Sequence, residues 1–121
     1  LVALRPGLLL ANPEGLSRYT MPPFLKDCEI IFRPPMENHE RHSAQYLQQA
    51  IGSEWIDMNL FSLGPDNVVV DGYQTALIAL LESKGLEVIP LTLRHSRMMG
   101  GGFHCVTLDT RRRGTMESYF S

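Results

Sequence analysis

One segment in the second half of the chain constrains the fold more than any other. It contains three runs that are typical of strands, 56–63, 68–70 and 86–93, and one helical run, 73–84. The first two runs are separated by Gly64-Pro65-Asp66-Asn67, a combination that is typical of a turn. The second run, Val68-Val69-Val70, is β-branched and favours a buried strand. The segment therefore predicts the order strand, strand, helix, strand, which belongs to the mixed α/β (α+β) class.

The predicted helix over 73–84 is supported by its periodicity and by both of its ends. Its apolar side chains recur one turn apart and share one face, at Ala76, Leu77, Leu80 and Leu81. Asp71 or Gly72 can cap the N-terminus of the helix. Gly85 stands where a left-handed C-terminal cap belongs.

The first half of the chain follows a similar order, although no residue-level repeat links the two halves. The apolar runs 2–4 and 8–11 flank Arg5-Pro6-Gly7 and predict a hairpin. A strand over 29–32 and a helix over 38–49 follow. Units of this kind bury one face and need neighbours, so we expect open sheet edges.

Composition and charge exclude several classes of protein. The chain has 121 residues, 44% of them hydrophobic and 20% charged, and a net charge of −2, which fits one small globular domain. This balance does not indicate a nucleic-acid or membrane surface. No apolar run reaches the length of a membrane span, and no signal segment opens the sequence. The chain begins at Leu1, not Met, and directly with an apolar run, so we expect it to begin within a fold.

The cysteines indicate a reducing compartment, and we expect a cytoplasmic protein. Cys28 and Cys105 are far apart, and neither stands in a pattern of metal ligands. We therefore expect neither a disulfide framework nor a bound metal, and no cofactor.

Cys105 is the first candidate for chemistry. It ends the run Gly100-Gly101-Gly102-Phe103-His104-Cys105, and the glycines allow close approach of the backbone to a ligand. The thiolate is the reactive form of cysteine, and clustered backbone N–H groups favour it. The alternative is a buried structural cysteine after a flexible loop, and the residues alone leave both interpretations open. We expect a strand over 104–108, in which His104 and Cys105 point to opposite faces.

A resemblance extends over nearly the whole chain. The segments on which the resemblance is based are Arg5-Pro6-Gly7 through Asn12-Pro13, Val69-Val70-Asp71, Gly85-Leu86-Glu87-Val88, Gly100 through Asp109, Arg111-Arg112-Arg113-Gly114-Thr115 and Ser118-Tyr119. Together they resemble the C-terminus of the arginine:glycine amidinotransferase family. The glycine-His-Cys run followed by the triple arginine is the specific part. Agmatine deiminases have a similar run, with an extra residue before the His and without this tail.

The resemblance implies a fold. The family belongs to the guanidine-modifying (pentein) superfamily, which forms an α/β-propeller of five ββαβ modules around a central active site. The resemblance therefore implies that residues 1–121 are the C-terminal fragment of a single domain. Residues 1–53 would be most of the preceding module, and residues 54–121 the last one.

The resemblance also implies a mechanism. Cys105 would attack the guanidinium carbon of L-arginine, form a covalent amidino-cysteine and release ornithine, and an acceptor amine would then take the amidino group. In the family the proton for the leaving amine comes from a His in a His-Ile-Asp segment, which should lie upstream of Leu1 together with a further Asp. None of the four histidines of this chain matches that His. We therefore expect the fragment alone to be inactive.

The expected substrate contacts carry over less completely. Ser53 matches the second of two adjacent serines that contact the amino-acid end of arginine in the family, whereas Gly52 replaces the first. Gly15 occupies the position of the carboxylate-binding arginine, and Arg18 is the nearest arginine. Gly102, within the glycine run, is the third expected contact. These departures leave the acceptor amine open.

The sequence leaves two alternatives to the transferase. A guanidine hydrolase or deiminase of the same superfamily would share the chemistry up to the covalent intermediate, with water in place of the amine; the triple-arginine tail favours the transferase. A non-catalytic interaction domain is the second alternative, and the intact glycine-His-Cys run argues against it. The expected partners are small molecules, L-arginine and an amine, with no nucleic acid and no membrane; a homodimer is an open possibility.

The other conspicuous residues have structural interpretations. We expect the triple arginine to be structural or solvated, the two methionines to pack in a loop, Asp109 to make structural hydrogen bonds and Cys28 to lie buried in a strand. These residues are Arg111-Arg112-Arg113, Met98-Met99, Asp109 and Cys28.

Overall fold

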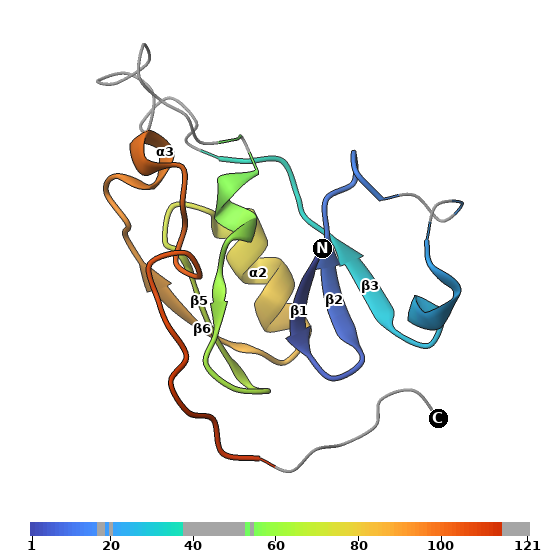
Figure 1. The fold of residues 1–121 in the computed structure, drawn as a ribbon. Helices are drawn as coiled ribbons and strands as arrows, with labels where there is room; N and C mark the ends of the chain where they lie inside the picture. The colour runs from blue at the N-terminus through green and yellow to red at the C-terminus, as the bar shows by residue number, and fades with distance from the viewer. Residues whose placement is uncertain (17–18, 20, 38–52, 54, 115–121) are drawn as a thin grey trace.

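The computed structural model describes residues 1–16, 19, 21–37, 53 and 55–114. They form two three-stranded sheets that lie side by side (Figure 1). The first sheet contains β1 (Val2–Arg5), β2 (Leu8–Ala11) and β3 (Glu29–Phe32). The second contains β4 (Phe61–Ser62), β5 (Asn67–Asp71) and β6 (Glu87–Leu91). The helical segments are η1 (Pro23–Leu25), η2 (Ile56–Met58), α2 (Thr75–Ser83) and α3 (Ser96–Met99).

The two sheets have the same topology. In each, the first two strands are antiparallel and the third strand is parallel to the second. The hairpin predicted around Arg5-Pro6-Gly7 is therefore confirmed, as is the order strand, strand, helix, strand in the second half. The mixed α/β class is confirmed as well. The five-module propeller and the division of the chain at residue 53 stay predictions.

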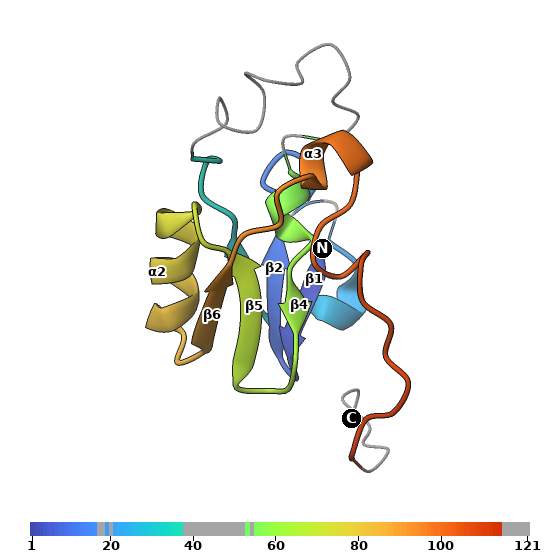
Figure 2. The same ribbon diagram turned by 90° about the vertical axis from the view of Figure 1, so that its left-hand side faces the viewer.

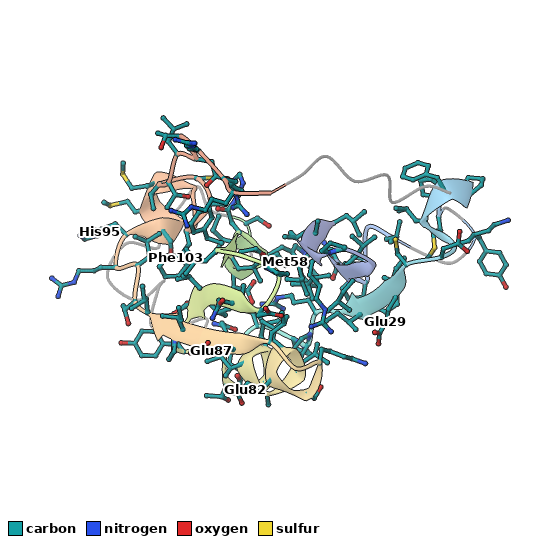
Figure 3. All side chains as sticks on the ribbon, turned by 90° about the horizontal axis from the view of Figure 1, so that it is seen from below. Glu29, Met58, Glu82, Glu87, His95 and Phe103 are labelled. Atoms are coloured by element: carbon teal, nitrogen blue, oxygen red, sulfur yellow. The ribbon has the colours of Figure 1, made fainter. Side chains whose placement is uncertain are left out.

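One apolar core joins both sheets and α2. It includes Leu10 and Ile31 from the first sheet, Val70 from the second, and Leu77 and Leu81 from the inner face of α2. In Figure 3 Met58 lies inside the molecule, whereas the acidic side chains of Glu29, Glu82 and Glu87 lie at its outside. The C-terminal end of α2 also reaches the first sheet, because Arg5 Nη2 donates to the carbonyl of Lys84 (2.8 Å).

The ends of α2 are only partly as predicted. Gly85 has a φ of 77°, which confirms the left-handed C-terminal position. The predicted N-terminal cap is wrong: Gln74 is the N-cap residue, and the carboxylate of Glu37 accepts hydrogen bonds from the Ala76 amide (2.8 Å) and the Thr75 hydroxyl (2.9 Å). Asp71 instead accepts from the Tyr73 amide (3.2 Å), so it stabilises the turn before the helix.

Two predicted strands are also wrong. Residues 56–63 do not form one strand, because η2 precedes the short β4; Asp57 and Met58 are both buried, and two successive residues of an extended strand would point to opposite faces. Residues 104–108 form no strand: residues 103–106 form turns, and residues 107 and 108 have no regular structure. The amide of Val106 donates to the carbonyl of Gly102 (3.3 Å), and the amide of Thr107 donates to that of His104 (3.3 Å).

The structure also bears on the expectations for the helix over 38–49, for Cys28 and for the two methionines. The helix predicted over 38–49 lies outside the described residues. Cys28 is half-buried in the bend before β3, not within a strand as predicted. The two methionines lie in the short helix α3, which the sequence did not indicate, and Met99 is exposed. No helix within the described ranges is long and apolar enough to cross a membrane.

Candidate active site around Cys105

The segment that carries Cys105 follows α3 and lies beside β4 (Figure 2). Cys105 is exposed and is a free thiol in the turn that follows the glycine run. The site therefore combines a turn near the end of the described chain with the η2–β4 connection, which lies more than forty residues earlier. The earlier segment is the fixed part, because Met58 and Leu60 both belong to the core.

Asn59 makes three hydrogen bonds to the turn that carries Cys105, two of them to Cys105 itself. Its Oδ1 accepts from the Cys105 amide (3.0 Å), and its Nδ2 donates to Cys105 Sγ (3.1 Å). Its backbone carbonyl accepts from the His104 amide (3.2 Å). The sequence analysis did not select this residue, which is one of three polar residues within the run 56–63, together with Asp57 and Ser62.

The orientation of the Asn59 amide follows from its partners. A backbone N–H can only donate, so the atom that faces the Cys105 amide must be the carbonyl oxygen Oδ1. The NH2 group is then directed at Sγ. A hydrogen-bond donor on sulfur favours the thiolate, which is the nucleophilic form.

The glycine run has a packing reason. Gly100 ends α3 in the left-handed conformation with φ of 69°, and the amide of Gly101 donates to the carbonyl of Ser96 (3.2 Å). A Cβ on Gly101 would lie 2.9 Å from Cys105 Cβ, and one on Gly102 would lie 2.6 Å from both Cβ and the carbonyl oxygen of Asn59. Both glycines therefore allow the turn to lie against Asn59.

A buried ion pair holds η2 against the first sheet. Arg33 follows β3, and its Nε lies 2.9 and 2.8 Å from the two carboxylate oxygens of Asp57. Each side chain is only 1% exposed, and the Arg33 guanidinium lies 4.9 Å from the centre of the Trp55 ring. Burial raises the pKa of Asp57, and the hydrogen bond and charge of Arg33 partly offset that effect. This pair was not predicted, and it fixes the segment that ends in Asn59.

The segment after Cys105 is held against β4. Arg112 donates from Nη2 to the carbonyl of Ser62 (2.7 Å) and from Nε to Asp109 Oδ2 (2.7 Å). Its guanidinium lies 5.8 Å from the centre of the Phe61 ring, and His104 meets the same ring edge-on at 6.3 Å. The structural interpretation of Asp109 and of the triple arginine is thus confirmed for Asp109 and Arg112.

A hollow of about 420 Å³ opens beside these residues. Its lining comes from β1, from the segment 58–62 and from the side of the Cys105 turn, where His104 and Arg112 contribute. Asn59 takes part in this lining, so the residue that contacts Sγ also borders the hollow. The described residues hold no cluster of three His, Cys, Asp or Glu side chains suited to a metal ion.

The expected substrate contacts are placed as follows. Ser53 is exposed before η2, and its Oγ accepts from the Trp55 amide (3.1 Å). Gly102 is buried against Asn59 and Ile56. Arg18 lies outside the described residues. The substrate contacts of all three stay predictions.

Comparison with known proteins identifies the relatives of this chain. No protein-family model matches it. Inosamine-phosphate amidinotransferase 1 of Streptomyces glaucescens is 44% identical over 124 residues, which cover 98% of this chain and 33% of that protein. The solved structure of inosamine-phosphate amidinotransferase from Streptomyces griseus matches with a TM-score of 0.84 at 46% identity, over 99% of this chain and 33% of that one. The chain is homologous to amidinotransferases.

A more distant relative has the same fold. The structure of an amidinotransferase from the saxitoxin biosynthetic pathway of Microseira wollei matches with a TM-score of 0.86 at 36% identity, over 98% of this chain and 33% of that one. The chain spans about a third of the length of these amidinotransferases. The resemblance to amidinotransferases, drawn from the glycine-His-Cys run and the arginine tail, is thereby confirmed.

Proposed function

We propose that the protein to which this chain belongs transfers the amidino group of L-arginine to an acceptor amine, with Cys105 as the nucleophile. The observation that carries the proposal is an exposed thiol whose Sγ receives a hydrogen bond from Asn59, in a homologue of amidinotransferases. Sulfur positioned in this way is suited to attack a carbon electrophile.

The proposed reaction has two halves. The Cys105 thiolate attacks the guanidinium carbon, a C–S bond forms, and the bond from that carbon to the arginine side-chain nitrogen breaks as this nitrogen takes a proton and leaves in ornithine. In the second half the acceptor amine attacks the same carbon and loses a proton, the C–S bond breaks, and the thiolate returns. No electrons are exchanged, so the reaction needs no redox cofactor.

The remaining roles are divided between this chain and the rest of the protein. We expect the proton donor to be a histidine upstream of this chain, as the family resemblance implies. Ser53, Arg18 and Gly102 are the proposed contacts of arginine within the chain. The cytoplasmic location and a homodimer stay predictions.

The test uses the full-length protein with L-arginine and hydroxylamine as a simple acceptor. We expect ornithine and hydroxyguanidine in equal amounts, together with an enzyme species whose mass is increased by one amidino group. Cys105→Ala should lose both the products and the mass increase, whereas Cys28→Ala should keep both, because Cys28 lies in a bend of the first sheet. Activity retained by Cys105→Ala would refute the proposal. Citrulline without hydroxyguanidine would indicate the deiminase instead.

A further inference from the structure

We propose that Asn59 is a catalytic residue, whose amide stabilises the Cys105 thiolate both when it attacks and when it leaves. The inference rests on the proposed function and deepens it. It begins with one side chain that contacts both the backbone and the sulfur of the same residue: Oδ1 binds the Cys105 amide at 3.0 Å and Nδ2 binds Sγ at 3.1 Å. Nδ2 thus touches the reacting atom itself.

The donor is held in place by rigid surroundings. Asn59 ends η2, where its own amide donates to the carbonyl of Ile56 (3.0 Å), and the adjacent Met58 and Leu60 are buried. Gly102 lies against the Cβ and the carbonyl of Asn59. The amide group is therefore pre-organised, and little reorganisation is needed when charge on sulfur changes.

The charge on sulfur changes twice in the proposed reaction. The free thiolate is a strong acceptor for Nδ2–H, whereas the sulfur of the amidino-cysteine is a neutral, weak acceptor. The hydrogen bond is therefore lost or weakened in the covalent intermediate and regained as the thiolate departs. An interaction of this kind favours the second half of the reaction, because a stabilised thiolate is the better leaving group.

This role predicts two effects of removing the donor. Asn59→Asp keeps an oxygen acceptor for the Cys105 amide but has no NH2 group, and Asn59→Ser is too short to contact both atoms. Alkylation of Cys105 by iodoacetamide near neutral pH should slow about tenfold or more in both variants, the range expected for a hydrogen bond to a charged group.

The second effect concerns the covalent intermediate. The full-length protein is loaded with L-arginine, freed of arginine, and mixed with hydroxylamine, and the loss of the amidino mass is followed. We expect both variants to lose it about tenfold more slowly than the parent protein, since the departing thiolate lacks its donor. Asn59→Ser adds no charge, so it separates this effect from attraction between the carboxylate that Asn59→Asp introduces and the cationic intermediate.

Asn67→Asp is the matched control. It makes the same change at the start of β5, where the amide of Asn67 donates to Glu87 and not to sulfur. Its alkylation rate and its rate of transfer should equal those of the parent. Unchanged alkylation rates in both Asn59 variants, with unchanged thermal unfolding, would overturn the proposal, as would an intermediate that is discharged at the parent rate. Alkylation does not require arginine, so it tests Asn59 even if the parent protein forms no amidino intermediate and the proposed function fails.

Discussion

At the scale of single residues, Asn59 joins the two parts of the candidate site, because its side chain contacts both the amide and the sulfur of Cys105. The run before Cys105 and the arginine tail were sufficient to select this cysteine, because both are local signals. Asn59 is 46 residues away, and its contact with Sγ depends on how the turn folds back onto η2. No periodicity or spacing encodes such a contact. The hydrogen-bond geometry of an amide also has no counterpart in sequence pattern, so Asn59 could only be found in three dimensions.

Gly102 provides a test of this packing. Gly102→Ala would place a Cβ 2.6 Å from the carbonyl oxygen of Asn59 and 3.0 Å from that of Ile56, and backbone atoms cannot yield as a flexible side chain can. We expect a free energy of unfolding lower by about 1–3 kcal/mol, the usual cost of overpacking, and a large loss of amidino-enzyme formation. Thermal unfolding and mass spectrometry measure the two effects.

Gly64→Ala is the control for that substitution. A Cβ at Gly64, in the turn between β4 and β5, meets no described atom within 4 Å. Stability and amidino-enzyme formation should both stay at the parent level. If Gly102→Ala behaved like this control, the close packing of the glycine run on Asn59 would be wrong.

At the scale of elements, local signals predicted the regular structure and failed where distant contacts decide. The β-branched run predicted β5, and the apolar periodicity that ends before Gly85 predicted α2. The run 86–93 that follows this glycine predicted β6. No local signal predicted η2, because its conformation depends on the contact of Asp57 with Arg33, the residue that follows β3 of the first sheet. The turns over 103–106 are likewise fixed by Asn59. The N-terminal cap of α2 was predicted wrongly for the same reason, because Glu37, which accepts a hydrogen bond from the Ala76 amide, is 39 residues away from it.

The Glu37 cap predicts a pH dependence. The hydrogen bonds from the Ala76 amide and then the Thr75 hydroxyl hold the pKa of Glu37 below its ordinary value of 4.5. A lowered pKa in the folded state means that the stabilisation is complete above the ordinary value and is lost as the pH falls through the lowered one. Amides of α2 should therefore exchange faster in Glu37→Gln than in the parent at neutral pH, and this difference should diminish on acidification.

The matched variant lies on the same helix. Glu82 is exposed near the C-terminal end of α2, so Glu82→Gln leaves the cap intact. It should show little of the neutral-pH effect of Glu37→Gln. A difference between Glu37→Gln and the parent that persists unchanged in acid would mean that the carboxylate charge is not what stabilises the first turn.

At the scale of the whole molecule, the described chain leaves much apolar surface exposed. Leu108 is 85% exposed, and other large apolar side chains exposed by 49–62% come from the chain start, η1, the β4–β5 turn, β6 and the Cys105 turn: Leu1, Phe24, Leu63, Leu91 and Val106. The sequence predicted open sheet edges, because units of this kind bury one face and need neighbours, but it did not predict these exposed apolar side chains. It could not indicate which surfaces they are, since that depends on the arrangement of both sheets around the shared core.

The isolated chain should contain the thiol site but not the complete catalytic site. Asn59, Cys105 and the core that supports them all belong to the 121 residues, whereas the proposed proton donor is upstream. Where the isolated chain folds, which far-ultraviolet circular dichroism can establish, Cys105 should react with iodoacetamide at the same rate as in the full-length protein. L-arginine and hydroxylamine should nevertheless give no ornithine, because the leaving nitrogen receives no proton. Ornithine production by the isolated chain, abolished by Cys105→Ala, would place the proton donor among its own four histidines.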